Sequence, residues 1–334
     1  MAFTPQYHIT AHTMRLIESI ATLKTKIEAA TVSVSWIPSL SRDAISRTAR
    51  SSTAIEGNPL TLKEVRILAE GGELPEVKDR DKQEVLNYLA ALRFISGNSE
   101  KKSLTEKDIL KLHKLVGNNV LDRGPVGQYR DYEVTVGEYN PPHHQEVTML
   151  MEDLIAWVNG PGQGLPAVIS SAIVHYQLET IHPFGDGNGR VGRLIGTWEL
   201  YRRKFDTHHI FAVDEVYNEN KQFYYRALYR VQSQQADLTG WIEYVCESVE
   251  ETLERVWQRI VAIRSGKEGE DRIVLTPKQE VLVKLLKENA LSIRDIQEAL
   301  KVTKPGAHFV LKPLIEAGIV KREGGYKSGK YSLV

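Results

Sequence analysis

Twelve consecutive residues, from His182 to Arg193, concentrate side chains that could carry out chemistry. A histidine with its usual pKa of about 6.5 can take up a proton, and the carboxylate of Asp186 can bind a hard cation. The glycines in this stretch allow a ligand to approach the backbone closely, and a helix beginning near Arg190 would direct its first N–H groups at an anion. The combination predicts an active site that handles phosphate.

The glycine spacing also fits a dinucleotide-binding fingerprint, because Gly187, Gly189 and Gly192 satisfy the pattern G-x-G-x-x-G. That fingerprint must follow a buried strand. Residues 165–181 instead carry apolar side chains at helical spacing, over a length typical of a helix. The P-loop pattern G-x-x-x-x-G-K-[ST] does not occur in the chain. We therefore expect a helix, a loop that carries the chemistry, and a second helix.

The composition is that of a soluble globular protein, since 42% of the 334 residues are hydrophobic and 26% are charged. The 43 lysines and arginines balance the 43 aspartates and glutamates, so the overall charge does not indicate nucleic-acid or membrane binding. The sequence has no apolar N-terminal region and no run that approaches the length of a membrane span. Its single cysteine, Cys246, excludes an intrachain disulfide, and we expect a cytoplasmic protein without membrane association.

Apolar residues recur at helical spacing along most of the chain, which predicts a mainly α fold. The main exception is the segment 127–142, where Glu133 to Gly137 contains β-branched residues and two prolines follow. This composition favours a short extended piece or hairpin. A lone hairpin beside helices is usually a flap, although the same alternation suits an ordinary core hairpin.

The C-terminal part reads as a separate small domain. Residues 265–271 are polar and contain two glycines, which is typical of a linker. Beyond it the pattern predicts three short helices and then a β-hairpin, at 276–288, 292–300, 303–318 and 319–334. We expect Ser292 to cap the second helix and Gly318 to end the third.

This order of helix, helix, turn, helix and hairpin resembles a winged helix-turn-helix domain. From Arg272 onward the chain carries 12 Lys+Arg against 6 Asp+Glu. The basic excess permits DNA binding, but the expected recognition helix offers only Lys304, His308 and Lys312 for contacts to bases or phosphates. Winged helices also bind proteins, so DNA and protein both remain candidate partners.

The sequence HPFGDGNGRVGR at 182–193 matches in full the pattern H-x-F-x-D-G-N-G-R-x-x-R, the signature of Fic-domain proteins. These proteins transfer AMP from ATP to protein hydroxyl groups. The resemblance extends over roughly 105–250 and more loosely over the whole chain. It implies a Fic-type helical core with a short β-hairpin flap, and three regions: N-terminal helices (1–100), a Fic catalytic domain (101–265) and a winged helix-turn-helix domain (272–334).

The resemblance assigns a role to each residue of the motif. His182 would be the general base that takes the proton from a Ser, Thr or Tyr hydroxyl. Phe184 would anchor the loop in the core, and Asp186 would bind Mg²⁺ (or Mn²⁺) that bridges the α and β phosphates of ATP. Five residues would bind the phosphates: Gly187, Asn188, Gly189, Arg190 and Arg193. Asn188 would act through its backbone and a side-chain donor, and Arg193 would orient the γ-phosphate.

Two further segments are implied to contact substrates. Tyr225 or Gln232 would touch the adenine base, although aromatic residues at helical spacing are as often part of a core. The predicted flap would pair with the target protein as a strand and close over the nucleotide, using Val134, Thr135, Val136 and Gly137.

A second motif lies upstream, where Ser52 to Gly57 reads STAIEG and matches the inhibitory pattern [S/T]-x-x-x-E-[G/N] of Fic proteins. Alone this pattern is weak, since a glutamate at a helix end is usually solvated. Together with the Fic signature it implies an N-terminal inhibitory helix at about 42–56, in which Glu56 pairs with Arg193 and Ser52 belongs to the inhibitory motif. ATP would then bind unproductively or not at all.

The leading hypothesis is an autoinhibited adenylyltransferase that uses ATP, modifies unknown target proteins and itself, and releases pyrophosphate. Related Fic-type proteins transfer phosphate or phosphocholine or remove AMP, so the reaction could differ on the same site. The alternative from another class is a DNA-binding transcriptional regulator with a sensory Fic domain. The family often forms homodimers, but nothing else in the sequence indicates one.

Overall fold

The computed structural model describes residues 3–31, 37–233, 237–264, 276–316, 320–323 and 329–333. The chain divides into two compact units, Met1–Thr25 with Asp43–Trp257 and Lys26–Arg42 with Gln258–Val334. The linker predicted at 265–271 and the helix end predicted at Gly318 lie outside the described residues.

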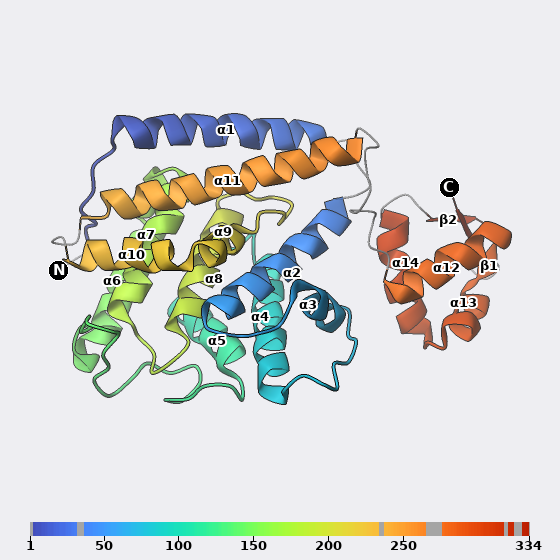
Figure 1. Ribbon diagram of the computed structural model, residues 1–334, viewed down its shortest axis with the longest axis horizontal. Helices are drawn as coiled ribbons and strands as arrows, with labels where there is room; N and C mark the ends of the chain where they lie inside the picture. Colours follow the sequence, from blue (N-terminus) through green and yellow to red (C-terminus); the bar gives the residue numbers. More distant parts are fainter. Residues whose placement is uncertain are drawn as a thin grey trace. The chain divides into compact units, whose positions relative to one another are not determined.

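The prediction of a mainly α fold is confirmed. The first unit is built from helices and two short 3-10 turns (Figure 1). Among the described residues no helix is both long enough and apolar enough to cross a bilayer. The elements up to the end of the long helix α11 are α1 (Ala11–Thr31), α2 (Ile37–Ile55), α3 (Leu62–Ala69), α4 (Asp79–Gly97), α5 (Glu106–Gly117), η1 (His144–Glu146), α6 (Val147–Asn159), η2 (Pro161–Gly164), α7 (Ala167–Ile181), α8 (Asn188–Arg202), α9 (Val213–Glu219), α10 (Lys221–Ser233) and α11 (Thr239–Arg264).

Helices α7 and α8 form the centre of the first unit (Figure 1). They pack against each other, while α4 and α5 cover α8 and α6 covers α7. Both central helices are buried on nearly all sides, and α8 buries Arg190, Arg193 and Glu199 as well as apolar residues. The predicted catalytic loop connects these two helices, so its ends are fixed by the most buried part of the fold.

The start of α5 shows how the sequence fixes a neighbour of this loop. Thr105 and Asp108 form a capping box, in which the backbone N–H of Thr105 donates to the Asp108 carboxylate at 2.8 Å. Lys101 also donates to this carboxylate at 2.6 Å. The cap fixes the start of α5, which packs against α8.

The hairpin predicted around 133–137 is only a tight turn in the structure. Val136 and Tyr139 exchange two backbone hydrogen bonds of 2.9 Å, and no longer strand forms around this bridge. Gly137 adopts a φ of +58°, which a glycine reaches without strain. The β-branched residues therefore end in a turn rather than in paired strands, because the segment has no neighbouring strand to extend the ladder.

The C-terminal elements of the second unit contain the three predicted helices and the predicted strand pair. Their order is α12 (Pro277–Glu288), β1 (Leu291–Ser292), α13 (Ile293–Leu300), α14 (Lys304–Glu316), β2 (Val320–Glu323) and β3 (Lys330–Leu333). The short strand β1 was not predicted. It pairs with β3 to give an antiparallel sheet in the order β1-β3-β2.

These elements close around one small apolar core. Tyr331 of β3 lies opposite both Leu291 and Arg322 in the sheet and is buried. The predicted cap at Ser292 is present, since its side chain accepts a hydrogen bond from the backbone N–H of Asp295. The buried core residues are Leu282, Leu286, Ile296, Leu300, Ala307, Val310, Leu311, Leu314, Val320 and Tyr331.

Candidate active site

The loop between α7 and α8 turns through two left-handed residues. His182 ends α7 with φ 50° and ψ 58°, and its N–H donates to the carbonyl of Leu178 at 2.9 Å. Gly187 precedes α8 with φ 81°. Positive φ is uncommon for histidine and costs energy, so the predicted base sits at a backbone position that the surrounding structure must enforce.

Phe184 and Asn188 close the loop on itself. Phe184 is fully buried, its N–H donates to Asn188 Oδ1 at 2.9 Å, and Asn188 Nδ2 donates to its carbonyl at 2.9 Å. The anchor expected at Phe184 is therefore present. Oδ1 and one N–H of the Asn188 amide therefore bind the loop backbone, and the expectation that this side chain also donates to phosphate stays a prediction. Helix α8 also begins at Asn188, two residues earlier than predicted.

Asp186 is held by backbone donors from two directions. Its Oδ2 accepts from the N–H of Asp122 at 3.0 Å, and its Oδ1 accepts from the N–H of Gly187 at 2.5 Å. Its side chain remains 28% exposed. A carboxylate fixed in this way can turn an oxygen lone pair to a cation from solvent.

His113 of α5 supports the loop and was missed from the sequence. Its ring stacks on Phe184 with a centroid distance of 3.7 Å. Nδ1 accepts the N–H of Gly127 at 2.9 Å, so Nε2 carries the proton and donates to the carbonyl of Asp186 at 3.0 Å. Burial lowers the pKa of His113 to about 4, which keeps this tautomer neutral. His113 lies four residues after Ile109, on the apolar face of the predicted helix. A histidine on that face is the sequence signal that could have revealed its role.

We expect His113→Phe to destabilise the protein by about 2 kcal/mol or more, measured as the free energy of unfolding in urea. Phenylalanine keeps an aromatic ring against Phe184, but the N–H of Gly127 and the carbonyl of Asp186 lose their partners, and each unsatisfied buried group costs about 1–3 kcal/mol. The matched control is His143→Phe, at a side chain that is 79% exposed. Equal stability of the two variants would show that the two hydrogen bonds do not hold the loop.

Arg130 is a second support that the sequence did not indicate. Its side chain is fully buried, and its guanidinium donates to backbone carbonyls of both the flap region and the catalytic loop. Nε donates to the carbonyl of His182 at 2.9 Å and Nη1 to that of Tyr132 at 3.0 Å. In addition, the N–H of Arg130 donates to the carbonyl of Pro183 at 2.9 Å. The residue thus ties the segment before the flap to the loop that carries His182.

Burial and one backbone contact determine the protonation state of His182. Burial, and then the nearby Arg130 guanidinium, lower the pKa of His182 to about 4. The imidazole is therefore neutral at pH 7. Nδ1 lies 3.3 Å from the carbonyl of Glu179, which can only accept a hydrogen bond, so we assign the proton to Nδ1. Nε2 then carries the lone pair that a general base needs.

Arg190 is held by a partner that the sequence did not reveal. Its Nη1 donates to Glu84 of α4 at 2.6 Å, and its Nη2 to Asp186 at 3.4 Å. The other oxygen of Glu84 accepts from Asn58, which follows the predicted inhibitory motif by one residue. Among the described residues, the buried Nε of Arg190 has no hydrogen-bond partner.

Arg193 makes the contact with Glu56 that the resemblance implied. Its Nη2 donates to Glu56 Oε1 at 2.6 Å, and its Nε donates to Ser52 Oγ at 2.7 Å. The Arg193 side chain is 1% exposed and that of Glu56 is 32% exposed. Helix α2 ends at Ile55, so Glu56 lies just beyond the helix rather than inside it.

Glu56 also lies close to Gly189, one of the glycines expected to bind phosphate. A Cβ placed on Gly189 would come within 2.5 Å of Glu56 Oε1 and 3.2 Å of Arg193 Nη1. Glycine is therefore required at this position for the carboxylate to approach the first turn of α8. An anionic group already occupies the space beside the start of this helix, where the dipole and the backbone N–H groups favour negative charge.

The residues predicted for the flap and for the adenine contact, or their neighbours, bind α10, α7 and the end of α2. Glu138, beside Gly137 at the tip of the turn, accepts from the hydroxyl of Tyr229 on α10 at 3.1 Å. The hydroxyl of Tyr139 donates to the carbonyl of Thr180, two residues before His182. Tyr225 donates to the carbonyl of Ile55 at 3.3 Å, which places it at the end of α2. Of the predicted flap residues, Thr135, Val136 and Gly137 are exposed and Val134 is half-buried.

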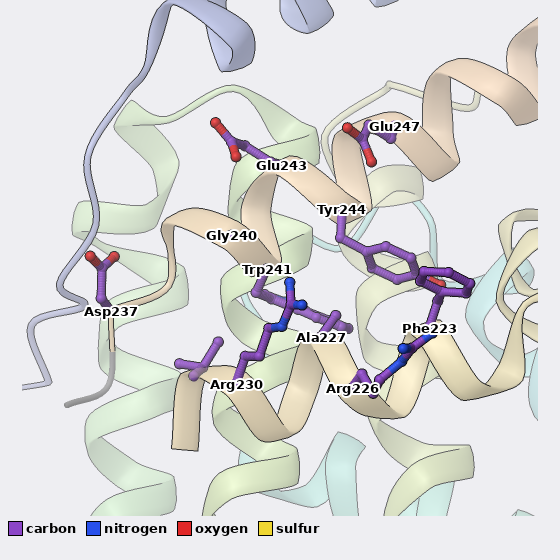
Figure 2. Close-up of a pocket in the computed structure, with 11 residues that line it drawn as sticks. Phe223, Arg226, Ala227, Arg230, Asp237, Gly240, Trp241, Glu243, Tyr244 and Glu247 are labelled. Atoms are coloured by element: carbon purple, nitrogen blue, oxygen red, sulfur yellow. The ribbon is translucent and has the colours of Figure 1, made fainter. Parts of the chain in front are cut away.

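A separate cavity of about 360 Å³ lies between α10 and α11 (Figure 2). Arg226 stacks on Phe223 at 4.1 Å, and Trp241 contributes to the lining. Figure 2 shows Glu243 and Glu247 projecting from α11, and these carboxylates bind Thr10 and His12. None of the residues that line this cavity belongs to the predicted catalytic or phosphate-binding set.

The segment that contains this loop is similar to known proteins. Residues 103–200 match the model of the Fic/DOC family. The chain is 32% identical to the protein adenylyltransferase fic-1 of Caenorhabditis briggsae and 31% identical to the protein adenylyltransferase Fic of Drosophila yakuba. Each of these alignments covers 61% of this chain; they cover 39% and 40% of the two relatives, so the chain spans about two fifths of their length.

Solved structures extend the similarity to the fold. A Fic family protein from Desulfovibrio desulfuricans G20 shares 27% identity with a TM-score of 0.67, over 99% of this chain and 98% of that one. Fic-1 from C. elegans shares 25% identity with a TM-score of 0.60, over 73% of this chain and 72% of that one. The helix-loop-helix with His182 and Asp186 lies inside residues 103–200, the segment of this chain that matches the Fic/DOC family model.

Proposed function

We propose that this protein transfers AMP from ATP to a hydroxyl group of a protein and that Glu56 restrains the reaction. The observation that carries the proposal is the placement of His182, which backbone contacts hold in one loop with Asp186 and the N-terminus of α8. The names of the adenylyltransferase relatives support the same reaction.

In this reaction the hydroxyl oxygen of the target attacks the α-phosphorus of ATP. The bond between the α-phosphorus and the oxygen that bridges to the β-phosphate breaks, and pyrophosphate leaves. Nε2 of His182 takes the hydroxyl proton, so that the attacking oxygen does not carry a positive charge. The first-turn N–H groups of α8, Arg190 and Arg193 stabilise negative charge on the phosphates.

Asp186 fits the metal site that this chemistry implies. Among the described residues no group of three or more His, Cys, Asp or Glu side chains could hold a metal, so the protein offers this carboxylate largely alone. Mg²⁺ is commonly bound by one or two carboxylates together with substrate phosphates and water, and Mn²⁺ accepts similar ligands. The ion would offset the charge of the α and β phosphates. Asp186 would hold it, and the N–H groups of Asp122 and Gly187 orient the carboxylate.

The proposed restraint follows from the position of Glu56. Its carboxylate binds Arg193 beside Gly189, where the nucleotide phosphates would have to lie. A negatively charged side chain at this place competes with ATP for the guanidinium and repels the phosphates. Ser52 contributes to the same contact, since it accepts from Arg193 through both its hydroxyl and its carbonyl.

The products distinguish AMP transfer from the other reactions of similar sites. We expect the Glu56→Gly protein with Mg²⁺ and ATP to release one pyrophosphate for each AMP that becomes attached to protein, measured by a coupled pyrophosphate assay and intact-protein mass spectrometry. Self-modification makes an added target unnecessary for this test. Release of ADP with phosphorylated protein would show phosphate transfer instead, and loss of AMP from premodified protein would show removal of AMP.

We infer that the three-stranded sheet with α12, α13 and α14 is a winged helix-turn-helix module. The element order, the common core and the basic excess from Arg272 support this. On α14 the side chains of Lys304, His308, Lys312 and Phe309 are exposed, the last at 79%. This mixture of three basic side chains and one large aromatic group suits a protein partner as well as DNA, and it is the basis for the alternative in which the chain acts as a regulator.

A further inference from the structure

Glu56 is not the only acidic residue connected to Arg193. The Arg193 Nε donates to Ser52 Oγ at 2.7 Å, and the Ser52 hydroxyl in turn interacts with Asp214 at the start of α9. Asp214 accepts a hydrogen bond from Tyr88 of α4 at 3.1 Å. A chain of polar contacts therefore runs from the guanidinium to a carboxylate that the proposed reaction does not use.

This chain is fully enclosed by the fold. Tyr88 and Ser52 are buried completely, and Asp214 is 2% exposed. The pKa of Asp214 lies above its usual value, because burial raises it by more than Arg193 and the hydroxyls of Tyr88 and Ser52 lower it. Tyr88 donates a hydrogen bond to Asp214, and the nearby Arg193 guanidinium favours the ionised form of the carboxylate.

The positions of Glu56 and Asp214 differ in one decisive respect. Glu56 follows the end of α2 and is one third exposed, so its side chain can leave Arg193 without unfolding a helix. Asp214 belongs to α9 and lies in the core, where Tyr88 of α4 donates a hydrogen bond to it. When Glu56 leaves, Arg193 would lose its nearest counter-charge, but the contacts through Ser52 to Asp214 would remain.

We propose that Asp214 is a positioning residue that acts through Ser52 to keep Arg193 oriented toward the nucleotide after Glu56 has been withdrawn. The proposal rests on the proposed function, in which Arg193 orients the γ-phosphate. Glu179 is a weaker candidate for this task. Burial raises the pKa of Glu179 to about 7, and among the described residues its buried Oε1 has no hydrogen-bond partner. It is therefore partly neutral and not connected to the guanidinium by hydrogen bonds.

The test compares the binding of Mg·ATP and Mg·ADP to the full chain by isothermal titration calorimetry. The parent protein carries Glu56→Gly and His182→Ala, which exposes the site and prevents turnover. We expect Asp214→Asn to lower the preference for ATP over ADP by about tenfold, the effect of one lost charge-assisted hydrogen bond. Ser52→Ala removes the connecting hydroxyl with little change in volume, and it should lower the preference in the same direction.

Asp206→Asn is the matched control. Asp206 is also buried, and it accepts the N–H groups of Ile210 and Phe211 at 3.0 Å rather than a contact to Arg193. A merely structural role of Asp214 would weaken ATP and ADP binding equally, as in the control, and that result would overturn the proposal. So would an unchanged preference in both Asp214→Asn and Ser52→Ala. Because binding is measured without transfer, failure of the proposed reaction would appear separately, as absence of AMP transfer by the Glu56→Gly protein.

Discussion

Replacing Glu56 with glycine is expected to raise the rate of AMP transfer by up to about 100-fold. Such a factor corresponds to a resting state in which about 1% of molecules have a free Arg193, and it requires roughly 2.7 kcal/mol. Removing one partner of a buried ion pair costs about 3–5 kcal/mol, and the partial exposure of Glu56 places its contribution at the lower end. The 2.6 Å contact is therefore strong enough to act as the restraint. The measurement is the initial rate of self-labelling from radioactive ATP.

Two controls make this result specific. Glu56→Gln keeps the shape of the side chain and removes its charge, so it should activate less than glycine but in the same direction. Glu73→Gly changes an exposed glutamate in another loop of the same unit and should leave the rate unchanged. Equal labelling by the wild-type protein and the Glu56→Gly variant would contradict the restraint.

Replacing His182 with alanine in the Glu56→Gly protein is expected to lower AMP transfer by about 10²–10⁴-fold, the usual contribution of a general base. Binding of Mg·ATP should change little, because the imidazole faces the attacking hydroxyl in the proposed reaction. The rate is measured by labelling and the affinity by calorimetry. A loss of rate with retained affinity would assign His182 to the chemical step.

The left-handed backbone at His182 needs its own control, since alanine is strained at a φ of 50°. His182→Asn tolerates this conformation and still lacks the proton acceptor, so it should lose as much activity as alanine. His12→Ala removes a histidine that contacts Glu247 at the surface and should have no effect. Normal labelling by His182→Asn would show that another group accepts the proton.

Much of the site could be predicted from the sequence because its residues are local. His182, Asp186 and the first turn of α8 lie within a few residues of each other, and the helical periodicity on both sides fixes the loop between them. The contact between Glu56 and Arg193 spans 137 positions. No local pattern predicts such a pair, and only the resemblance to the Fic family indicated it.

The supporting residues could not be predicted in this way. Glu84 and Arg130 come from other elements, and their polar contacts leave no spacing pattern in the sequence. His113 interrupts an apolar helix face, but this position does not show which groups the side chain contacts. Asn188 was assigned to phosphate because an amide can donate to an anion, but the tight turn places its side chain against the backbone of Phe184. The flap was predicted as a hairpin because β propensity does not show whether a partner strand is present.

The most direct test of the whole account is the labelling of the Glu56→Gly protein with ATP that carries radioactive phosphorus at either the α or the γ position. AMP transfer by this site predicts that label enters protein from the α position only, and that His182→Ala in the same protein lowers the rate of labelling by about 10²–10⁴-fold. Label that enters from the γ position, or an α-labelling rate that is unchanged without His182, would contradict it.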